Sequence, residues 1–145
     1  MRVVLDTNVI VSGLIWGGPP RHLLDLARQK TVTLYTSTAL LDELARVLSR
    51  EKFAARLSAR GLTPSGIMRG YAALAHAVAA PVIARTVPAD PDDDAVIACA
   101  LTAKASLIAT GDRDLLILHP FQTIAILNPS DAVQGILTDD SSGVV

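Results

Sequence analysis

Four acidic side chains stand where an apolar run ends or a helical pattern begins. They are Asp6, Glu43, Asp93 and Asp112. If the apolar runs are parallel strands, these residues meet at the edge where the strands end, which is where such sheets bind ligands. Carboxylates crowded together repel one another, and burying them without a counter-charge is unfavourable. The sequence therefore predicts a site for Mg²⁺ or Mn²⁺, hard cations that prefer oxygen ligands and assist chemistry at phosphoryl groups.

Helical geometry indicates which acid faces the predicted edge, because successive residues turn by about 100°. A helix predicted over residues 38–50 carries an apolar stripe centred near Leu44, and Glu43 falls at the border of that stripe. Asp42 points in roughly the opposite direction and is expected in solvent, as a first-turn acid that the helix dipole favours.

A second helix, predicted over residues 92–104, offers three consecutive acids. Asp93 lies in line with the apolar stripe of this helix, whereas Asp92 and Asp94 are turned to either side of it. Asp93 is therefore the predicted inward acid, with Asp94 in reserve.

A basic stretch follows Glu43 and is opposed only by Glu51. Its members are Arg46, Arg50, Lys52, Arg56 and Arg60. Such charges contact phosphates and position a polyanion without reading its sequence, although a solvated helix face is the alternative interpretation. The net charge of −1 argues against a general nucleic-acid coat protein.

The remaining composition is typical of a small globular domain in a reducing compartment. Cys99 is the sole cysteine and lies in an apolar stretch, and His22, His76 and His119 are scattered without metal-ligand spacing. No apolar run reaches the roughly 18 residues of a membrane span, and the N-terminus lacks a signal-peptide pattern. A cytoplasmic protein is expected.

The elements that must position the acids alternate between strand and helix. Strands are predicted at residues 2–5, 32–36, 106–110 and 123–127, with a short fifth starting at Val82–Ile83. Helices are predicted after Pro19–Pro20, over 38–50, from Thr63–Pro64 through Ala79, and over 92–104. This order predicts a three-layer α/β/α sandwich around a mostly parallel sheet of four to five strands. Residues 1–137 form one domain, and residues 138–145 are expected to be an unstructured tail.

The four acidic segments together resemble the motifs of the PIN-domain family of metal-dependent ribonucleases. Val3–Val9 resembles the first motif, Glu43 stands at the position of the second acid, and residues 90–94 resemble the third segment. Thr110–Leu116 resembles the segment that carries the fourth acid. Within the family, the chain is most similar to single-domain toxins of the virulence-associated type.

That resemblance implies cleavage of RNA phosphodiester bonds with Mg²⁺ or Mn²⁺, a homodimer, and inhibition by a small antitoxin protein. It implies that the metal-binding and catalytic acids are Asp6, Glu43, Asp93 and Asp112. Supporting roles fall to Thr7, Asn8 and Thr110, and contacts with the RNA backbone to Arg46, Arg50 and Lys52.

Two other classes of protein are weighed against this interpretation. A receiver or dehalogenase-type domain needs further acids near Asp6 or a late lysine, but Asn8 stands two residues on and no lysine follows Lys104. A catalytically inactive binding module need not keep four mutually repelling acids. Trp16, beside Gly17–Gly18, is expected to be a packed turn, with a partner-binding surface as the alternative.

Overall fold

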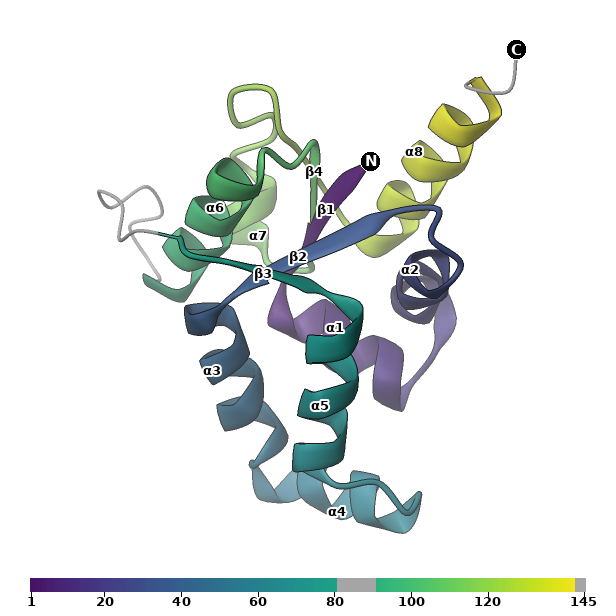
Figure 1. Cartoon of the computed structure of the whole chain (residues 1–145), viewed down its shortest axis with the longest axis vertical. Coiled ribbons are helices and arrows are strands. Elements are labelled where there is room, and N and C mark those ends of the chain that lie inside the picture. Colours follow the sequence, from purple (N-terminus) through teal and green to yellow (C-terminus); the bar gives the residue numbers. More distant parts are fainter. Residues whose placement is uncertain (81–90, 143–145) are drawn as a thin grey trace.

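The computed structural model describes residues 1–80 and 91–142, which form an α/β/α sandwich (Figure 1). The described strands are β1 Arg2–Leu5, β2 Thr33–Ser37, β3 His76–Val78, β4 Leu107–Ala109 and β5 Ala125–Leu127. The described helices are α1 Thr7–Ile15, α2 Gly18–Arg28, α3 Thr38–Leu48, α4 Glu51–Ala59, α5 Pro64–Leu74, α6 Pro91–Ala103, α7 Arg113–Leu116 and α8 Pro129–Ser142. Within the described ranges, no helix is both long and apolar enough to cross a membrane.

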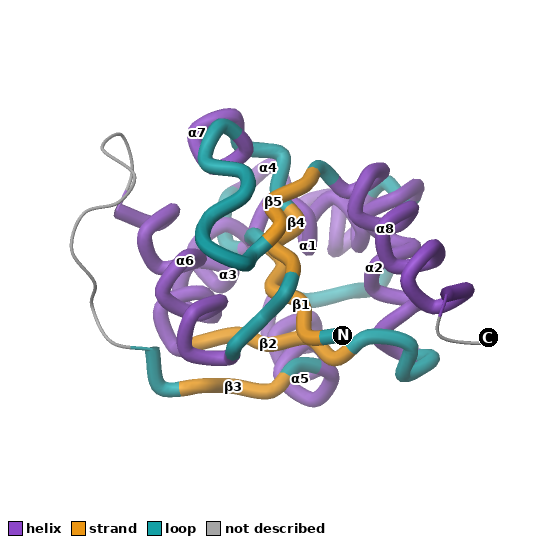
Figure 2. The backbone as a smooth tube through the Cα atoms, turned by 90° about the horizontal axis from the view of Figure 1, so that it is seen from above, coloured by secondary structure: helices purple, strands orange, loops and turns teal. Residues whose placement is uncertain are grey.

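The five strands form one parallel sheet in the order β3-β2-β1-β4-β5. Val3 and Leu5 face one layer of helices and Val4 faces the other, and all three are buried. Helices α1 to α5 and α8 contribute to the first layer, while α6, α7 and Leu40 of α3 contribute to the second. Figure 2 shows α6 and α8 on opposite sides of the strands. The predicted fold class is confirmed, because the near-continuous apolar runs are strands buried on both faces.

The edge strand β3 lies where the sequence predicted helix. The helix predicted to reach Ala79 ends at Leu74, because Ala75 adopts an extended conformation and His76 pairs with Tyr35 of β2. His76 and Ala77 are exposed, so this strand carries no apolar pattern by which it could be recognised. The fifth strand predicted at Val82–Ile83 lies outside the described residues.

The C-terminal helix α8 corrects the prediction of an unstructured tail from residue 138. The helix continues through Ser142, and residues 143–145 lie outside the described part of the chain. Ala132, Val133 and Ile136 are buried against the core and fix the start of the helix. Extending a formed helix is far easier than starting one, so the polar residues that follow remain helical.

Helix α6 is apolar on more than one side because it packs on β1 to β4 and also on α3. Val96, Ile97, Cys99 and Ala100 are completely buried within it. Burial raises the pKa of the Cys99 thiol to about 12, although a hydrogen bond with Ser37 acts in the opposite direction. Cys99 is buried, and its thiol stays protonated and unreactive at neutral pH.

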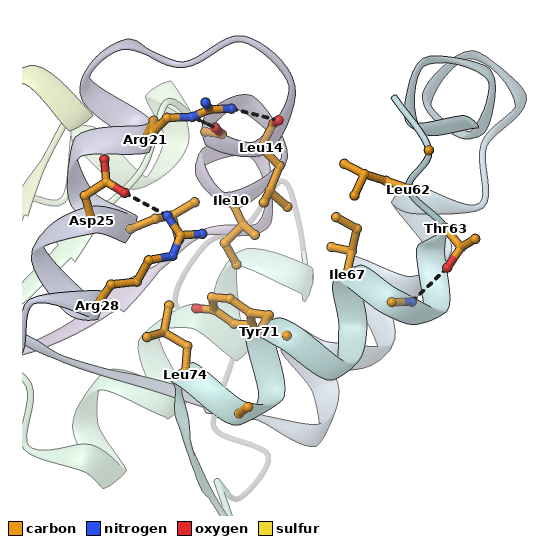
Figure 3. Close-up of a pocket in the computed structure, with 16 residues that line it drawn as sticks. Ile10, Leu14, Arg21, Asp25, Arg28, Leu62, Thr63, Ile67, Tyr71 and Leu74 are labelled. Carbon is orange, nitrogen blue, oxygen red and sulfur yellow. Dashed lines mark hydrogen bonds and ion pairs between the residues drawn. The ribbon is translucent and has the colours of Figure 1, made fainter. Parts of the chain in front are cut away.

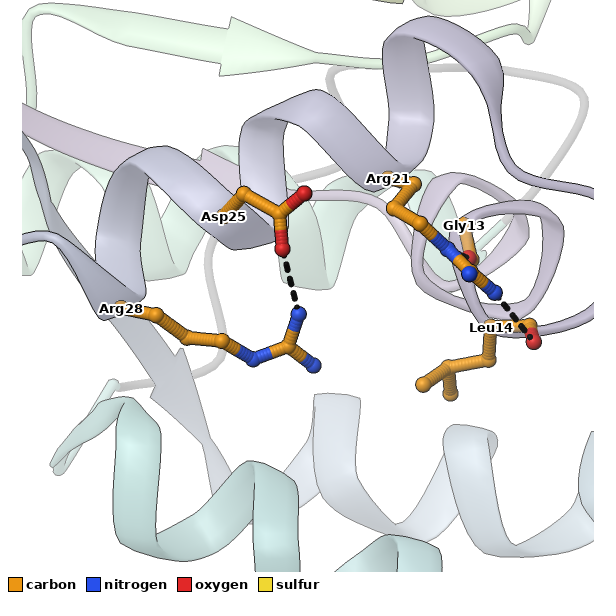
Figure 4. Close-up of polar contacts among 5 residues, drawn as sticks. All are labelled: Gly13, Leu14, Arg21, Asp25 and Arg28. Atoms are coloured by element: carbon orange, nitrogen blue, oxygen red, sulfur yellow. Dashed lines mark hydrogen bonds and ion pairs between the residues drawn. The ribbon is translucent and has the colours of Figure 1, made fainter.

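A tight corner joins α1 to α2 and fixes the C-terminal end of α1 (Figure 4). The Arg21 guanidinium donates to the carbonyl oxygens of Gly13 and Leu14, at 2.9 and 3.1 Å. Its charge also opposes the partial negative charge of the helix C-terminus. A Cβ atom at Gly13 would lie 2.9 Å from the backbone of Pro20, so this approach requires glycine.

We predict opposite effects of alanine at two helical glycines. Gly13→Ala forces the α1–α2 corner apart and should lower the free energy of unfolding by about 1–3 kcal/mol. Gly70→Ala in α5 meets no atom within 4 Å and should raise it by about 0.5–1 kcal/mol through helix propensity. Urea unfolding measures both changes, and a stable Gly13→Ala protein would contradict the close packing of this corner.

Candidate metal centre

The predicted acids meet at the topological switch point of the sheet. From the central strand β1 the chain builds β2 and β3 on one side, and it later builds β4 and β5 on the other. The carboxyl ends of β1 and β4 are therefore neighbours from which the connections lead in opposite directions, and this leaves a crevice between them. Asp6 follows β1 directly, and Thr110 and Asp112 follow β4.

Three carboxylates from distant parts of the chain come together in this crevice. Asp6, Asp93 and Asp112 each offer an oxygen atom, and the three atoms lie within 4.8 Å of one another. Asp6 and Asp93 expose only 5% and 3% of their surfaces, and Asp112 is half-buried. Two ligand oxygens on opposite sides of one Mg²⁺ are about 4.2 Å apart. A small adjustment of these side chains therefore suits them to a hard divalent cation.

Hydrogen bonds hold the first of these carboxylates in place. Asp6 caps α1, where its Oδ1 accepts a bond from the backbone N–H of Thr7 at 2.8 Å. Its Oδ2 accepts a bond of 2.7 Å from the hydroxyl of Thr110, which is completely buried. The same hydroxyl oxygen accepts a bond of 3.0 Å from the backbone N–H of Asp112. Thr110 thus joins two of the three acidic positions.

Helix N-termini provide part of the positive field around the cluster. Asp6 caps α1, Asp112 caps the short helix α7 and accepts a bond of 2.9 Å from the N–H of Asp114, and Asp93 lies in the first turn of α6. Unpaired N–H groups at these ends favour negative charge. This field offsets part of the repulsion between the carboxylates. A bound cation would neutralise the remainder.

The crevice opens into a hollow of about 330 Å³ that also contains the fourth predicted acid. Glu43 lines this hollow from α3 and is half-buried, whereas its neighbour Asp42 is exposed. Glu43 lies outside the group of three close oxygens. Asp94 is buried but belongs neither to that group nor to the lining of the hollow.

Comparison with known proteins agrees with this geometry. The sequence profile described as the PIN domain matches residues 2–114. The chain belongs to the PIN-domain family. No match was found among the curated proteins.

Among solved structures, the PIN domain is similar to the crystal structure of VapBC2 from Rickettsia felis bound to a DNA fragment from their promoter. The TM-score is 0.58 at 15% sequence identity, and the alignment covers 88% of this chain and 98% of the other. At this identity the similarity establishes the fold, which is the predicted one.

The three residues predicted to support the acids all lie at the crevice of the PIN domain. Thr7 and Asn8 line the hollow, with Thr7 buried and Asn8 exposed. The Thr7 hydroxyl is buried and has no hydrogen-bond partner among the described residues. A buried hydroxyl without a partner is typical of a site that binds a ligand or ordered water. This observation agrees with the predicted metal centre.

The predicted basic residues divide into two groups. Arg50, which precedes α4, lines the hollow, while Arg46 and Lys52 are exposed and lie outside its lining. The hollow also contains two aromatic residues that the sequence did not assign to it, Trp16 and Phe53. Trp16 could have been suspected from its place beside two glycines, but α4, which carries Phe53, was not predicted.

A larger hollow of about 970 Å³ lies between α1, α2 and α5 and differs in chemistry (Figure 3). Ile10, Leu62, Ile67 and Leu74 give it an apolar lining. Its acid, Asp25, is bonded to Arg28 at 2.7 Å (Figure 4). Among the described residues, this hollow therefore has no carboxylate cluster to attract a cation, and the cluster that could hold one lies at the smaller hollow.

Thr110 provides a test of how the cluster is held. Thr110→Val removes the donor to Asp6 and the acceptor for the N–H of Asp112, so we predict a loss of about 1–3 kcal/mol in the free energy of unfolding. Because such bonds orient metal ligands, Mn²⁺ should bind about tenfold more weakly. Urea unfolding with and without Mn²⁺ measures both effects, and Thr110→Ser should preserve them. Equal stabilisation of the valine variant and the wild type by Mn²⁺ would contradict this role.

Proposed function

We propose that this PIN domain is a metal-dependent endoribonuclease that hydrolyses RNA phosphodiester bonds with Mg²⁺ or Mn²⁺. The observation that carries the proposal is the meeting of Asp6, Asp93 and Asp112 within 4.8 Å at the switch point of the sheet. Three carboxylates so close together are compatible with a stable fold when a divalent cation neutralises them. The resemblance of their segments to the family motifs supports RNA as the substrate.

The chain's own residues then have separate roles. Asp6, Asp93 and Asp112 hold the cation, and Thr110 orients Asp6. Glu43 lies outside the close group but lines the same hollow, and it would add its carboxylate to the metal site from α3. When bound, the cation polarises a phosphoryl oxygen, lowers the pKa of water and stabilises the leaving oxygen.

The positive charge of Arg50 complements a phosphate group brought into the hollow. Arg46 and Lys52 are exposed beside it and would extend the contact along an RNA backbone. We propose that these three residues bind RNA without reading its bases. Arg50 should contribute most, because it alone of the three lines the hollow.

We further propose that the protein is the toxin of a toxin–antitoxin pair, acting as a cytoplasmic homodimer that a small antitoxin inhibits. The sequence resemblance to virulence-associated toxins supports this role, as does the fold shared with a VapBC protein. Expression of the wild-type chain should arrest growth, and the product of an adjacent reading frame should restore it. Arrest by an inactive Asp6→Asn chain would contradict a toxicity that depends on cleavage.

Paired acid variants test the nuclease directly. Asp6→Asn and Glu43→Gln should lower the rate of RNA cleavage by at least about 100-fold, more than loss of an outer-shell contact does. Asp42→Asn is the matched control, since Asp42 is exposed beside Glu43 on the same helix, and it should cleave normally.

EDTA should abolish wild-type cleavage. Circular dichroism verifies folding, and full activity of Asp6→Asn would overturn the assignment. RNA binding without cleavage by the wild type would instead indicate an inactive binding module.

Salt dependence tests the basic residues. Arg50→Ala should weaken binding about equally for all RNA sequences. The slope of log affinity against log salt should become less steep by about one unit, the value of one phosphate contact. Arg69→Ala, an exposed arginine on α5, is the matched control and should bind RNA normally. Fluorescence anisotropy of labelled RNA measures affinity. A changed sequence preference in Arg50→Ala would mean that this side chain reads bases.

A further inference from the structure

The hollow beside the three acids contains the chain's sole tryptophan. Trp16 follows α1 directly, lines the hollow together with Asp6 and Asp112, and exposes 64% of its surface. A large aromatic ring left in water beside charged groups gives up the stabilisation that burial would bring. Its position is therefore better explained by a ligand than by the core of the protein.

The ring is exposed but held in place. The backbone N–H of Trp16 donates to the Ser12 carbonyl at 2.8 Å, and Arg21 donates to the carbonyls of Gly13 and Leu14 in the last turn of α1. The Arg56 guanidinium carbon lies 4.1 Å from the centre of the indole ring, which is a close cation–π contact from α4. Arg60 adds a bond of 3.3 Å to the Leu14 carbonyl. A ring held in this way loses little conformational freedom when it binds a ligand.

The chemistry around Trp16 matches a nucleotide better than a protein surface. The chain has one Trp, two Phe and two Tyr residues, and Trp16 and Phe53 both line this hollow. Aromatic rings mixed with arginines are typical of surfaces that bind unpaired nucleic acid, because every base offers a flat face for stacking. An apolar protein surface bound here would cover Asp6 and Glu43 without supplying a positive charge to neutralise their carboxylates. A nucleotide brings a base for the ring and a phosphate for the metal centre.

We propose that Trp16, held by Arg56, is a stacking platform for an unpaired nucleobase of the RNA and so positions the adjoining phosphate at the acidic cluster. The proposal rests on the proposed nuclease function and adds a binding residue to it. It also explains why Arg56 of α4 and Arg60, which follows α4, both contact the end of α1. Duplex RNA, whose bases are already stacked on one another, cannot use this platform.

Trp16 fluorescence is a direct probe, because no second tryptophan contributes to the emission. The wild-type chain is titrated in Ca²⁺, a hard cation chosen to occupy the acids. The titrants are a short unstructured RNA, the duplex form of that RNA, and an abasic backbone of equal length. Unpaired RNA should quench the emission saturably. The duplex and the abasic backbone should leave it unchanged at concentrations where anisotropy shows them bound. Equal quenching by all three would overturn the proposal.

Variants separate stacking from a structural role. Trp16→Ala should weaken the binding of unpaired RNA about tenfold or more and raise the KM for cleavage, while Trp16→Phe should restore most of the affinity. Leu137→Ala, an exposed apolar residue on α8, is the matched control and should change neither property. Unfolding midpoints show whether each variant folds. Unaltered RNA affinity of a folded Trp16→Ala protein would overturn the platform.

The two proposals fail in different ways. Absence of RNA cleavage by the wild type in Mg²⁺ would remove the nuclease, and with it the phosphate-positioning part of the platform, whatever the fluorescence shows. Cleavage without quenching would keep the nuclease and overturn the platform. Quenching that depends on protein concentration and needs no RNA would assign Trp16 to a contact between copies of the chain, which also overturns it.

Discussion

The central physical constraint on this structure is the repulsion between carboxylates that the fold brings close together. At a separation of 4.8 Å, two ionised carboxylates oppose each other by on the order of 3 kcal/mol at an effective dielectric constant of about 20. Asp6, Asp93 and Asp112 form three such pairs, and Glu43 adds a further negative charge to the same hollow. Helix N-termini and the buried Thr110 hydroxyl offset part of this repulsion. A divalent cation would offset much more, so the three acids form a candidate metal centre, and the chain holds them together at some expense in stability.

The parallel sheet is what makes this arrangement available to a small chain. Strand order places the ends of β1 and β4 side by side, and the helix that leads into β4 brings its first turn to the same edge. Three segments far apart in the sequence thus supply one acid each within a single sandwich. The α1–α2 corner adds the second feature of the site, because Gly13 and Arg21 fix the end of α1 from which Trp16 extends.

Much of this could be predicted from the sequence, since strand ends and helix faces are local properties. The apolar run before Asp6 ends at Leu5 as predicted, and the face of α3 places Glu43 rather than Asp42 in the hollow. Other features depend on tertiary contacts that leave no local signal. The exposed strand β3 is defined by its pairing with β2, and the contact between Arg56 and Trp16 exists because α4 packs near the end of α1. The start of α8 is likewise fixed by packing, and its polar end follows by extension of the formed helix.

The most direct test of the metal centre is a crystal of the protein soaked in Mn²⁺, with anomalous scattering recorded to locate the ion. The account predicts a strong anomalous peak within coordination distance of Asp6, Asp93 and Asp112, at the ends of β1 and β4. A well-ordered crystal in which these three side chains point to separate places, or in which Mn²⁺ binds elsewhere and leaves them empty, would contradict it.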